Sequence, residues 1–131
     1  MKLKVRVCET DLLGHINHKS YFDYIDESIS HFFLEHNIGI ELPNTFILAK
    51  VSCEFLAQGY FGQTLRLRSF PIEVGTKSVT FVSHIINDWD DKLRDKGQSV
   101  LVYFNSELKE TLLIPHDIKE ILNEYRGDLD D

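Results

Sequence analysis

The sequence lacks the features that mark several large classes of protein. It has no run of about 18 apolar residues, the length that a membrane-spanning helix needs. Its first residues also lack the continuous apolar stretch of a secretion signal. Its two cysteines, Cys8 and Cys53, form neither a CxxC pair nor the spacing of a zinc site. We therefore expect a cytoplasmic protein with two reduced thiols and no membrane partner.

Basic residues are also scarce. The chain has 14 Lys and Arg against 21 Asp and Glu, which gives a formal net charge of −7 at pH 7. Nucleic-acid phosphates are bound by clustered positive charge, so this balance argues against nucleic acid as a partner. It leaves room for a small phosphorylated ligand, which a few local basic residues can bind. A length of 131 residues with 43% hydrophobic residues is typical of one globular domain, which we expect to span residues 1–131.

The hydrophobic pattern predicts one long helix among five strands. Apolar residues recur at helical spacing from Asn17, a good N-cap residue, to a terminator near Gly39, and Pro115 is expected to start a short second helix. Alternation predicts strands over residues 2–8, 46–57, 64–74, 79–86 and 98–108, with a bulge near Pro71 and a charged hairpin loop over 88–96. In the second strand, the odd-numbered residues 47–57 are expected to form one apolar face.

Short turns between the last four strands imply antiparallel neighbours. The apolar face of the long helix needs a partner, and the sheet supplies it. We therefore predict an α+β fold in which a five-stranded, largely antiparallel sheet wraps around one helix. The remaining sheet face and the strand edges need cover as well, which predicts a homodimer or homotetramer that pairs edge strands.

The candidate chemistry lies just before the long helix. An acid, a glycine, two histidines and an asparagine gather there, at Asp11, Gly14, His15, Asn17 and His18. The free N–H groups of a first helical turn attract negative charge. A carboxylate beside them suits acyl transfer, because it attacks or activates water while the N–H groups stabilise the oxyanion.

This segment also allows a purely structural interpretation and several other functional ones. On composition alone, an Asp before a glycine turn is more often a turn or cap residue. A metal site at Asp11, His15 and His18 is disfavoured, because the two histidines straddle the boundary between turn and helix and no second ligand cluster is evident. The sequence has no G-x-S-x-G elbow for a serine hydrolase and no P-loop for a nucleotide.

The segment D-x-x-G-H-x-N-x-x-x-Y from Asp11 to Tyr21, followed by an aromatic-rich acidic helix, resembles the opening of the 4-hydroxybenzoyl-CoA thioesterase family of hotdog proteins. The likeness continues through the strand over 46–57, the glycine turns near 59–62 and 75–78, and the last strand before Pro115. It implies a hotdog fold and acyl-CoA thioesterase activity without a metal or organic cofactor. Acyl carrier protein is the alternative thiol carrier.

The resemblance also implies roles for individual residues. The family's catalytic carboxylate falls on Asp11, and the helix amide that polarises the thioester carbonyl falls near Asn17 or His18. The acyl pocket is expected at a dimer interface beside the helix, with coenzyme A across two subunits. Residues expected to bind substrate are Gly14, His15, Tyr21, Tyr24, Lys77 and Ser78, with Arg66 and Arg68 as weaker candidates.

The chain departs from the family pattern at two positions. His18 stands where many members have a second Asn, and Ile29 stands where many have an Arg. Two further hypotheses stay open at this point. One is a non-catalytic acyl-CoA-binding module, since a fold does not fix a function. The other is a hotdog dehydratase or hydratase, which the missing proline after Gly14 and His15 disfavours.

Overall fold

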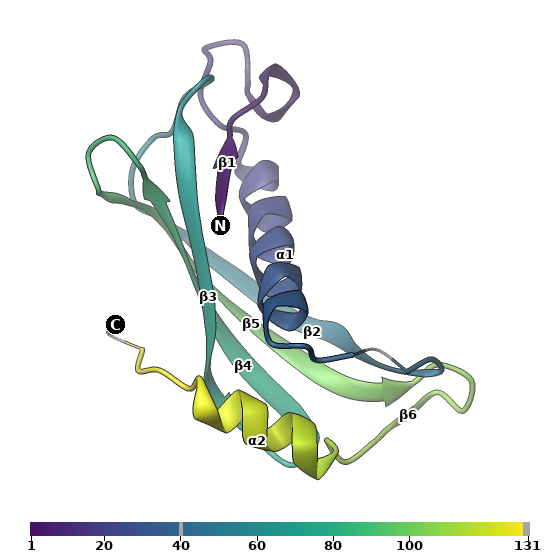
Figure 1. Ribbon diagram of the computed structural model, residues 1–131. Helices are drawn as coiled ribbons and strands as arrows, with labels where there is room; N and C mark the ends of the chain where they lie inside the picture. The colour runs from purple at the N-terminus through teal and green to yellow at the C-terminus, as the bar shows by residue number, and fades with distance from the viewer. Residues whose placement is uncertain (40, 130–131) are drawn as a thin grey trace.

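A curved antiparallel sheet wraps around one long helix in the computed structural model, which describes residues 1–39 and 41–129 (Figure 1). Ile40, Asp130 and Asp131 of the expected domain lie outside the described residues. The elements, in chain order, are β1 (Lys2–Lys4), the 3-10 turn η1 (Val7–Glu9), α1 (His18–Glu35), β2 (Asn44–Phe55), β3 (Thr64–Val74), β4 (Ser78–Asn87), β5 (Leu93–Asn105), β6 (Glu110–Thr111) and α2 (His116–Glu124).

The strand order is β1-β3-β4-β5-β2, and every pairing is antiparallel. The short β6 adds to the end of β5 and was not expected from the sequence. β2 lies at one edge of the sheet, and β1 covers only the first residues of β3 at the other. The arrangement confirms the predicted α+β architecture, including the bulge beside Pro71.

Helix α1 begins and ends where local chemistry requires it. The Asn17 side chain accepts a hydrogen bond from the Lys19 backbone N–H at 3.0 Å, which caps the first turn as predicted. The helix ends before Asn37, whose φ of 56° lies in the left-handed region. The sequence pointed to Gly39 for this role, but Asn37 already tolerates the turn, because Asn adopts this conformation more readily than other side chains.

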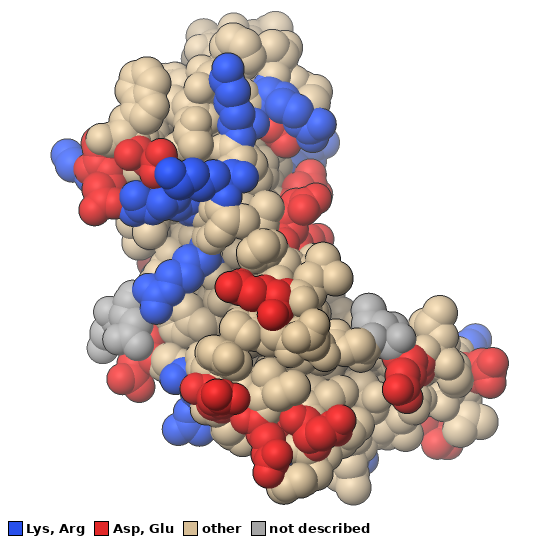
Figure 2. Space-filling model, in the orientation of Figure 1, with Lys and Arg blue, Asp and Glu red and all other residues tan. Residues whose placement is uncertain are grey.

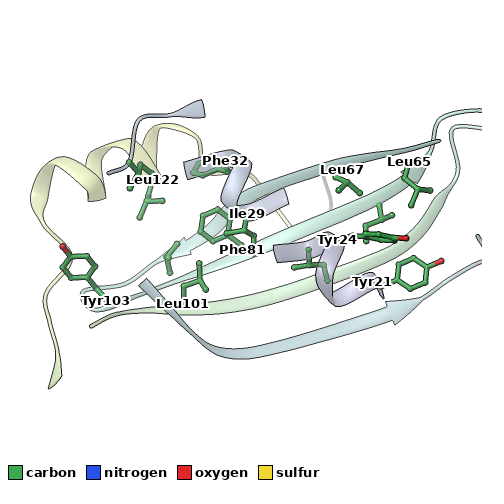
Figure 3. Close-up of a cluster of buried hydrophobic side chains, with 14 of the residues drawn as sticks. Tyr21, Tyr24, Ile29, Phe32, Leu65, Leu67, Phe81, Leu101, Tyr103 and Leu122 are labelled. Atoms are coloured by element: carbon green, nitrogen blue, oxygen red, sulfur yellow. The ribbon is translucent and has the colours of Figure 1, made fainter. Parts of the chain in front are cut away.

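The apolar face of α1 packs against the concave face of the sheet (Figure 3). The sheet offers a small residue at the closest approach: a Cβ added to Gly97 would lie 2.5 Å from Ile25 Cδ1. Fully burying one large aliphatic or aromatic side chain contributes about 1.5–3 kcal/mol, so this core dominates stability. Its largest members include Tyr24, Phe32, Phe81, Leu101 and Leu122.

Two predicted boundaries were wrong. The strand expected over 2–8 stops at Lys4, because pairing with β3 ends at Thr64 and the chain turns into η1, which leaves Val7 exposed. The loop expected over 88–96 is shorter, since β5 already begins at Leu93. The charged residues of this segment suggested an exposed loop, but residues 93–96 form the start of β5, and Arg94 and Asp95 are buried.

The expected single apolar face of β2 was also wrong. The register with β5 shifts between Leu48 and Lys50, so Ala49 is bulged and the alternation reverses there. Phe46 therefore faces α1 before the bulge and stacks on Phe33, whereas Val51 faces α1 after it. A prediction that assumes strict alternation along β2 therefore assigns the residues of half of the strand to the wrong face of the sheet.

Membrane spans, disulfides and metal sites can be examined for the described residues. No helix there is long and apolar enough to span a membrane. Both Cys8 and Cys53 are free thiols. No group of three or more acidic, His or Cys side chains within 1–39 and 41–129 is placed to hold a metal ion.

Candidate active site

The loop before α1 is fixed by backbone hydrogen bonds. The Asp11 N–H donates to the His15 carbonyl at 2.8 Å, and Gly14, with φ of 80°, makes the sharp turn between them. The segment after β2 then holds this hairpin in place: Phe61 N–H donates to the Gly14 carbonyl, and Ile16 N–H donates to the Gly59 carbonyl, both at 2.9 Å. The loop therefore presents its side chains in a set geometry.

Asp11 is exposed, and only one of its carboxylate oxygens is engaged. Oδ1 accepts hydrogen bonds from the backbone N–H groups of Leu13 at 2.8 Å and His15 at 3.2 Å. Among the described residues, Oδ2 has no hydrogen-bond partner. Asp11 is thus a turn residue, as composition favours, and at the same time presents a free oxygen to solvent. These two hydrogen bonds fix the orientation of the side chain.

The first turn of α1 supplies a free hydrogen-bond donor. Asn17 is held by a bond from its own N–H to the Glu9 carbonyl at 2.7 Å, and it caps Lys19. Ser20 N–H donates to the Asn17 carbonyl at 2.9 Å. The backbone N–H of His18 has no partner within the described part of the chain. It lies at the positive end of an 18-residue helix, where a developing negative charge is stabilised.

These groups meet at a cavity of about 470 Å³. Burial raises the pKa of Tyr21 to about 12, and nearby Asp95 adds to the shift, so the phenol is neutral at physiological pH. The Phe55 ring lies 5.6 Å from that of Tyr21 and 6.3 Å from that of His18, edge to face, and forms an aromatic wall. The cavity is lined by Asp11, His15, Ile16, His18, Tyr21, Phe55, Leu56, Ala57 and Gln58.

Four of the predicted site residues line this cavity, namely Asp11, His15, His18 and Tyr21. Asn17 and Gly14 do not line it but shape it, the first as helix cap and the second through its positive φ. Their assigned functional roles stay predictions.

Three other predicted residues lie elsewhere. Tyr24 faces a different cavity between α1 and β1, beside Glu9. Lys77 and Ser78 lie at the turn between β3 and β4. β3 separates that turn from the cavity by about 30 Å, taking about 3.3 Å per strand residue. Within one chain, neither residue can meet a ligand part bound at Asp11.

The sequence did not point to the second wall of the cavity, formed by Phe55 to Gln58. Phe55 was placed on the apolar face of a strand, and Gln58 was placed in a turn. This wall depends on a contact between segments that are distant in the sequence. The Ile16 N–H donates to the Gly59 carbonyl, and this bond brings the end of β2 against the loop before α1. No local pattern in residues 55–58 encodes that pairing.

Charge is unevenly spread over the surface. In the view of Figure 2, Lys and Arg side chains gather over the upper half of the molecule, near β1 and the loop before α1, while acidic side chains dominate around α2. Three basic residues in or near β1 and β3 form ion pairs: Lys2 and Arg66 with Asp88, and Arg6 with Glu9. The residues that line the cavity include no Lys or Arg.

The sequence profile of the thioesterase-like superfamily matches residues 5–122. The chain belongs to this superfamily. The match covers the cavity, both of its walls and every strand of the sheet except β1. The fold is accordingly the hotdog fold, in which an antiparallel sheet wraps a long helix. The finer assignment to 4-hydroxybenzoyl-CoA thioesterases stays a prediction.

This thioesterase-like chain is also similar in sequence to an individual protein. The uncharacterized protein YsmA of Bacillus subtilis (strain 168) is 32% identical over 80 residues, which are 60% of this chain. The match spans about half of that relative, 54% of its length.

Two solved structures agree with the fold over almost the full length. A predicted thioesterase from Bacillus stearothermophilus superposes with a TM-score of 0.88 and 24% identity, covering 98% of this chain and 96% of the other. A 1,4-dihydroxy-2-naphthoyl-CoA thioesterase from Synechocystis gives a TM-score of 0.85 and 14% identity, covering 100% and 96%.

Proposed function

We propose that this protein hydrolyses acyl-coenzyme A thioesters, with Asp11 as the catalytic carboxylate and the His18 backbone N–H as the oxyanion donor. The observation that carries the proposal is the shared cavity, which a carboxylate with a free oxygen and the start of α1 both line. Membership of the thioesterase-like superfamily supports the reaction class, and the named activity of the Synechocystis protein supports coenzyme A as thiol carrier. Acyl carrier protein is the alternative carrier.

The reaction follows from these groups. The thioester carbonyl oxygen points at the His18 N–H, which stabilises negative charge as the tetrahedral intermediate forms. The free Asp11 oxygen either attacks the acyl carbon or takes a proton from an attacking water. The carbon–sulfur bond then breaks, and the coenzyme A thiolate leaves and is protonated. If Asp11 attacks, the product of this step is an anhydride between Asp11 and the acyl group, which water hydrolyses to release the acid and regenerate the carboxylate. If water attacks, the acid is released directly. One water is consumed by either route, and no cofactor is consumed.

A second subunit would complete the cavity. Its outer wall is formed by the end of the edge strand β2 and the residues that follow it, where Phe55 and Leu56 are each 52% exposed. Apolar side chains at an unpaired edge favour pairing with another chain. We infer a dimer that covers β2 and closes the acyl pocket.

The direct test is thiol release from a panel of short, long and aromatic acyl-CoAs. Asp11→Asn keeps the acceptor for the Leu13 and His15 N–H groups but cannot act as base or nucleophile. We expect kcat to fall by about 100-fold or more. Asp117→Asn, which removes an equal charge on α2, should match the wild type. Equal rates for Asp11→Asn and wild type would remove Asp11 from the mechanism, and tight acyl-CoA binding without thiol release would indicate a binding module.

A further inference from the structure

The sheet beneath α1 contains a buried acid that the proposed mechanism does not use. Asp95 on β5 is 0% exposed. Among the described residues, neither of its carboxylate oxygens has a hydrogen-bond partner of normal geometry, and the nearby Cys53 thiol is at best a weak donor. A buried carboxylate without partners is strongly unfavourable, because burial removes its hydration without replacing it.

The neighbouring cation does not compensate Asp95. Arg94 lies at a register shift between β4 and β5, and its guanidinium binds Asp90 at 2.7 Å and the Lys92 carbonyl at 3.3 Å rather than Asp95. Asp95 instead shares the concave face with Gly97, which lies under Ile25 of α1. Its unused hydrogen-bonding capacity is therefore directed into the space between helix and sheet.

Asp95 lies one side chain behind the wall of the catalytic cavity. On the paired strands, Asp95 is directly opposite Phe55, and residues so paired have Cβ atoms about 5 Å apart on the same face. Tyr21, the other aromatic residue of the wall, is close enough for the Asp95 charge to raise its pKa. Asp95 itself does not line the cavity, and Phe55, which does, is 52% exposed, so an outward rotation of the Phe55 ring is the movement that would join Asp95 to the cavity.

We propose that Asp95 is the polar end of the acyl pocket and accepts a hydrogen bond from a donor group at the far end of the acyl chain. The inference rests on the proposed thioesterase function. The geometry orders the contacts: the thioester lies at Asp11 and His18, the chain passes Tyr21 and Phe55, and its terminal hydroxyl or amino group reaches Asp95. Burial raises the pKa of Asp95 to about 6, so the group is mostly ionised at pH 7.5 and a strong acceptor.

The test compares kcat/KM for matched acyl-CoAs of four, six and eight carbons in three series: unsubstituted, ω-hydroxy and ω-amino. At one chain length, the wild type should prefer a donor-bearing chain by about 10- to 100-fold, as expected for one hydrogen bond to a charged group. The hydroxy and amino series identify which donor is accepted. Asp95→Ala should abolish the preference while retaining hydrolysis of the unsubstituted chain, and Asp95→Asn should keep part of the preference for the hydroxyl.

Glu54→Ala serves as the matched control, because it removes a neighbouring exposed carboxylate from the opposite face of β2. It should leave the preference intact. Equal kcat/KM for all three series in the wild type, or an unchanged preference in folded Asp95→Ala, would overturn the role of Asp95 alone. Absence of Asp11-dependent hydrolysis for every thioester would overturn the proposed function and this inference with it. Conversion of the dimer to a monomer by Asp95→Ala, with the preference retained, would assign Asp95 to assembly instead.

Discussion

At the scale of single residues, Asp95 links stability to pH. Burial is the main cause that raises its pKa from 3.8 to about 6, and the Glu54 charge adds to it. The groups that face it are Tyr21 from α1 and the thiol of Cys53 on β2, whose own pKa burial raises to about 12. Because the folded pKa is the higher one, the protonated form stabilises the fold below about pH 4, and this stabilisation is lost as pH rises to about 6.

Asp95→Asn should therefore stabilise the protein at neutral pH. A pKa shift of about two units corresponds to a loss of about 3 kcal/mol in the free energy of unfolding when Asp95 is ionised. The Asn amide removes the charge, but its own unpaired polar atoms stay buried at some cost. We therefore expect the free energy of unfolding to rise by about 1–3 kcal/mol at pH 8. Urea unfolding at pH 4, 6 and 8 measures it. The gain should grow from pH 4 to pH 6 and then level off. Glu107→Gln, at an exposed carboxylate that does not act on Asp95, should show no such trend, and a gain that is independent of pH would contradict the titration of Asp95.

Gly59 is a residue-scale constraint on the active site. A Cβ there would lie 2.3 Å from Ile16 Cδ1 and 3.2 Å from the Tyr21 hydroxyl. Gly59→Ala should thus push both residues out of place, at a cost of about 1–3 kcal/mol from overpacking, and lower kcat/KM. Thermal unfolding and thiol release measure the two effects. Gly39→Ala is the control, since nothing lies within 4 Å of its added Cβ, and it should change neither quantity measurably.

At the scale of elements, the start of α1 allows the oxyanion donor to be removed without breaking the helix. Proline has no N–H but is favoured at the first helical position, which His18 occupies. It also requires an extended residue before it, and Asn17 has φ of −65° and ψ of 133°. His18→Pro should therefore fold normally and lower kcat by about 100-fold, as the loss of one oxyanion donor does.

His18→Ala separates the backbone from the side chain. It keeps the N–H and removes the imidazole, so it should retain most of the activity if the amide is the donor. Circular dichroism and thermal unfolding of both variants check that the helix is intact. Near-normal kcat in His18→Pro would show that carbonyl polarisation comes from another group.

The elements that the sequence predicted are those with local signals. Asn17 identified the start of α1, Pro71 identified a bulge, and short turns identified antiparallel neighbours. The bulge at Ala49 was not predicted, because it arises from the register between β2 and β5, and no residue type within β2 indicates that register. The position of Asp11 before the helix was predicted, but Asp95 was hidden in a segment taken for a charged loop. Its burial depends on strands and a helix far away in the sequence.

At the scale of the whole molecule, the β2 edge should carry the assembly. Leu48 is 46% exposed on this edge, and a second β2 paired across a two-fold axis would bury it. Leu48→Lys should convert the dimer to a folded monomer, seen by sedimentation velocity, because a buried unpaired ammonium is strongly unfavourable there. Thiol release should fall with it, since the pocket then loses its outer cover. Leu34→Lys, 78% exposed on α1, should leave both unchanged, whereas a dimeric Leu48→Lys would place the interface elsewhere.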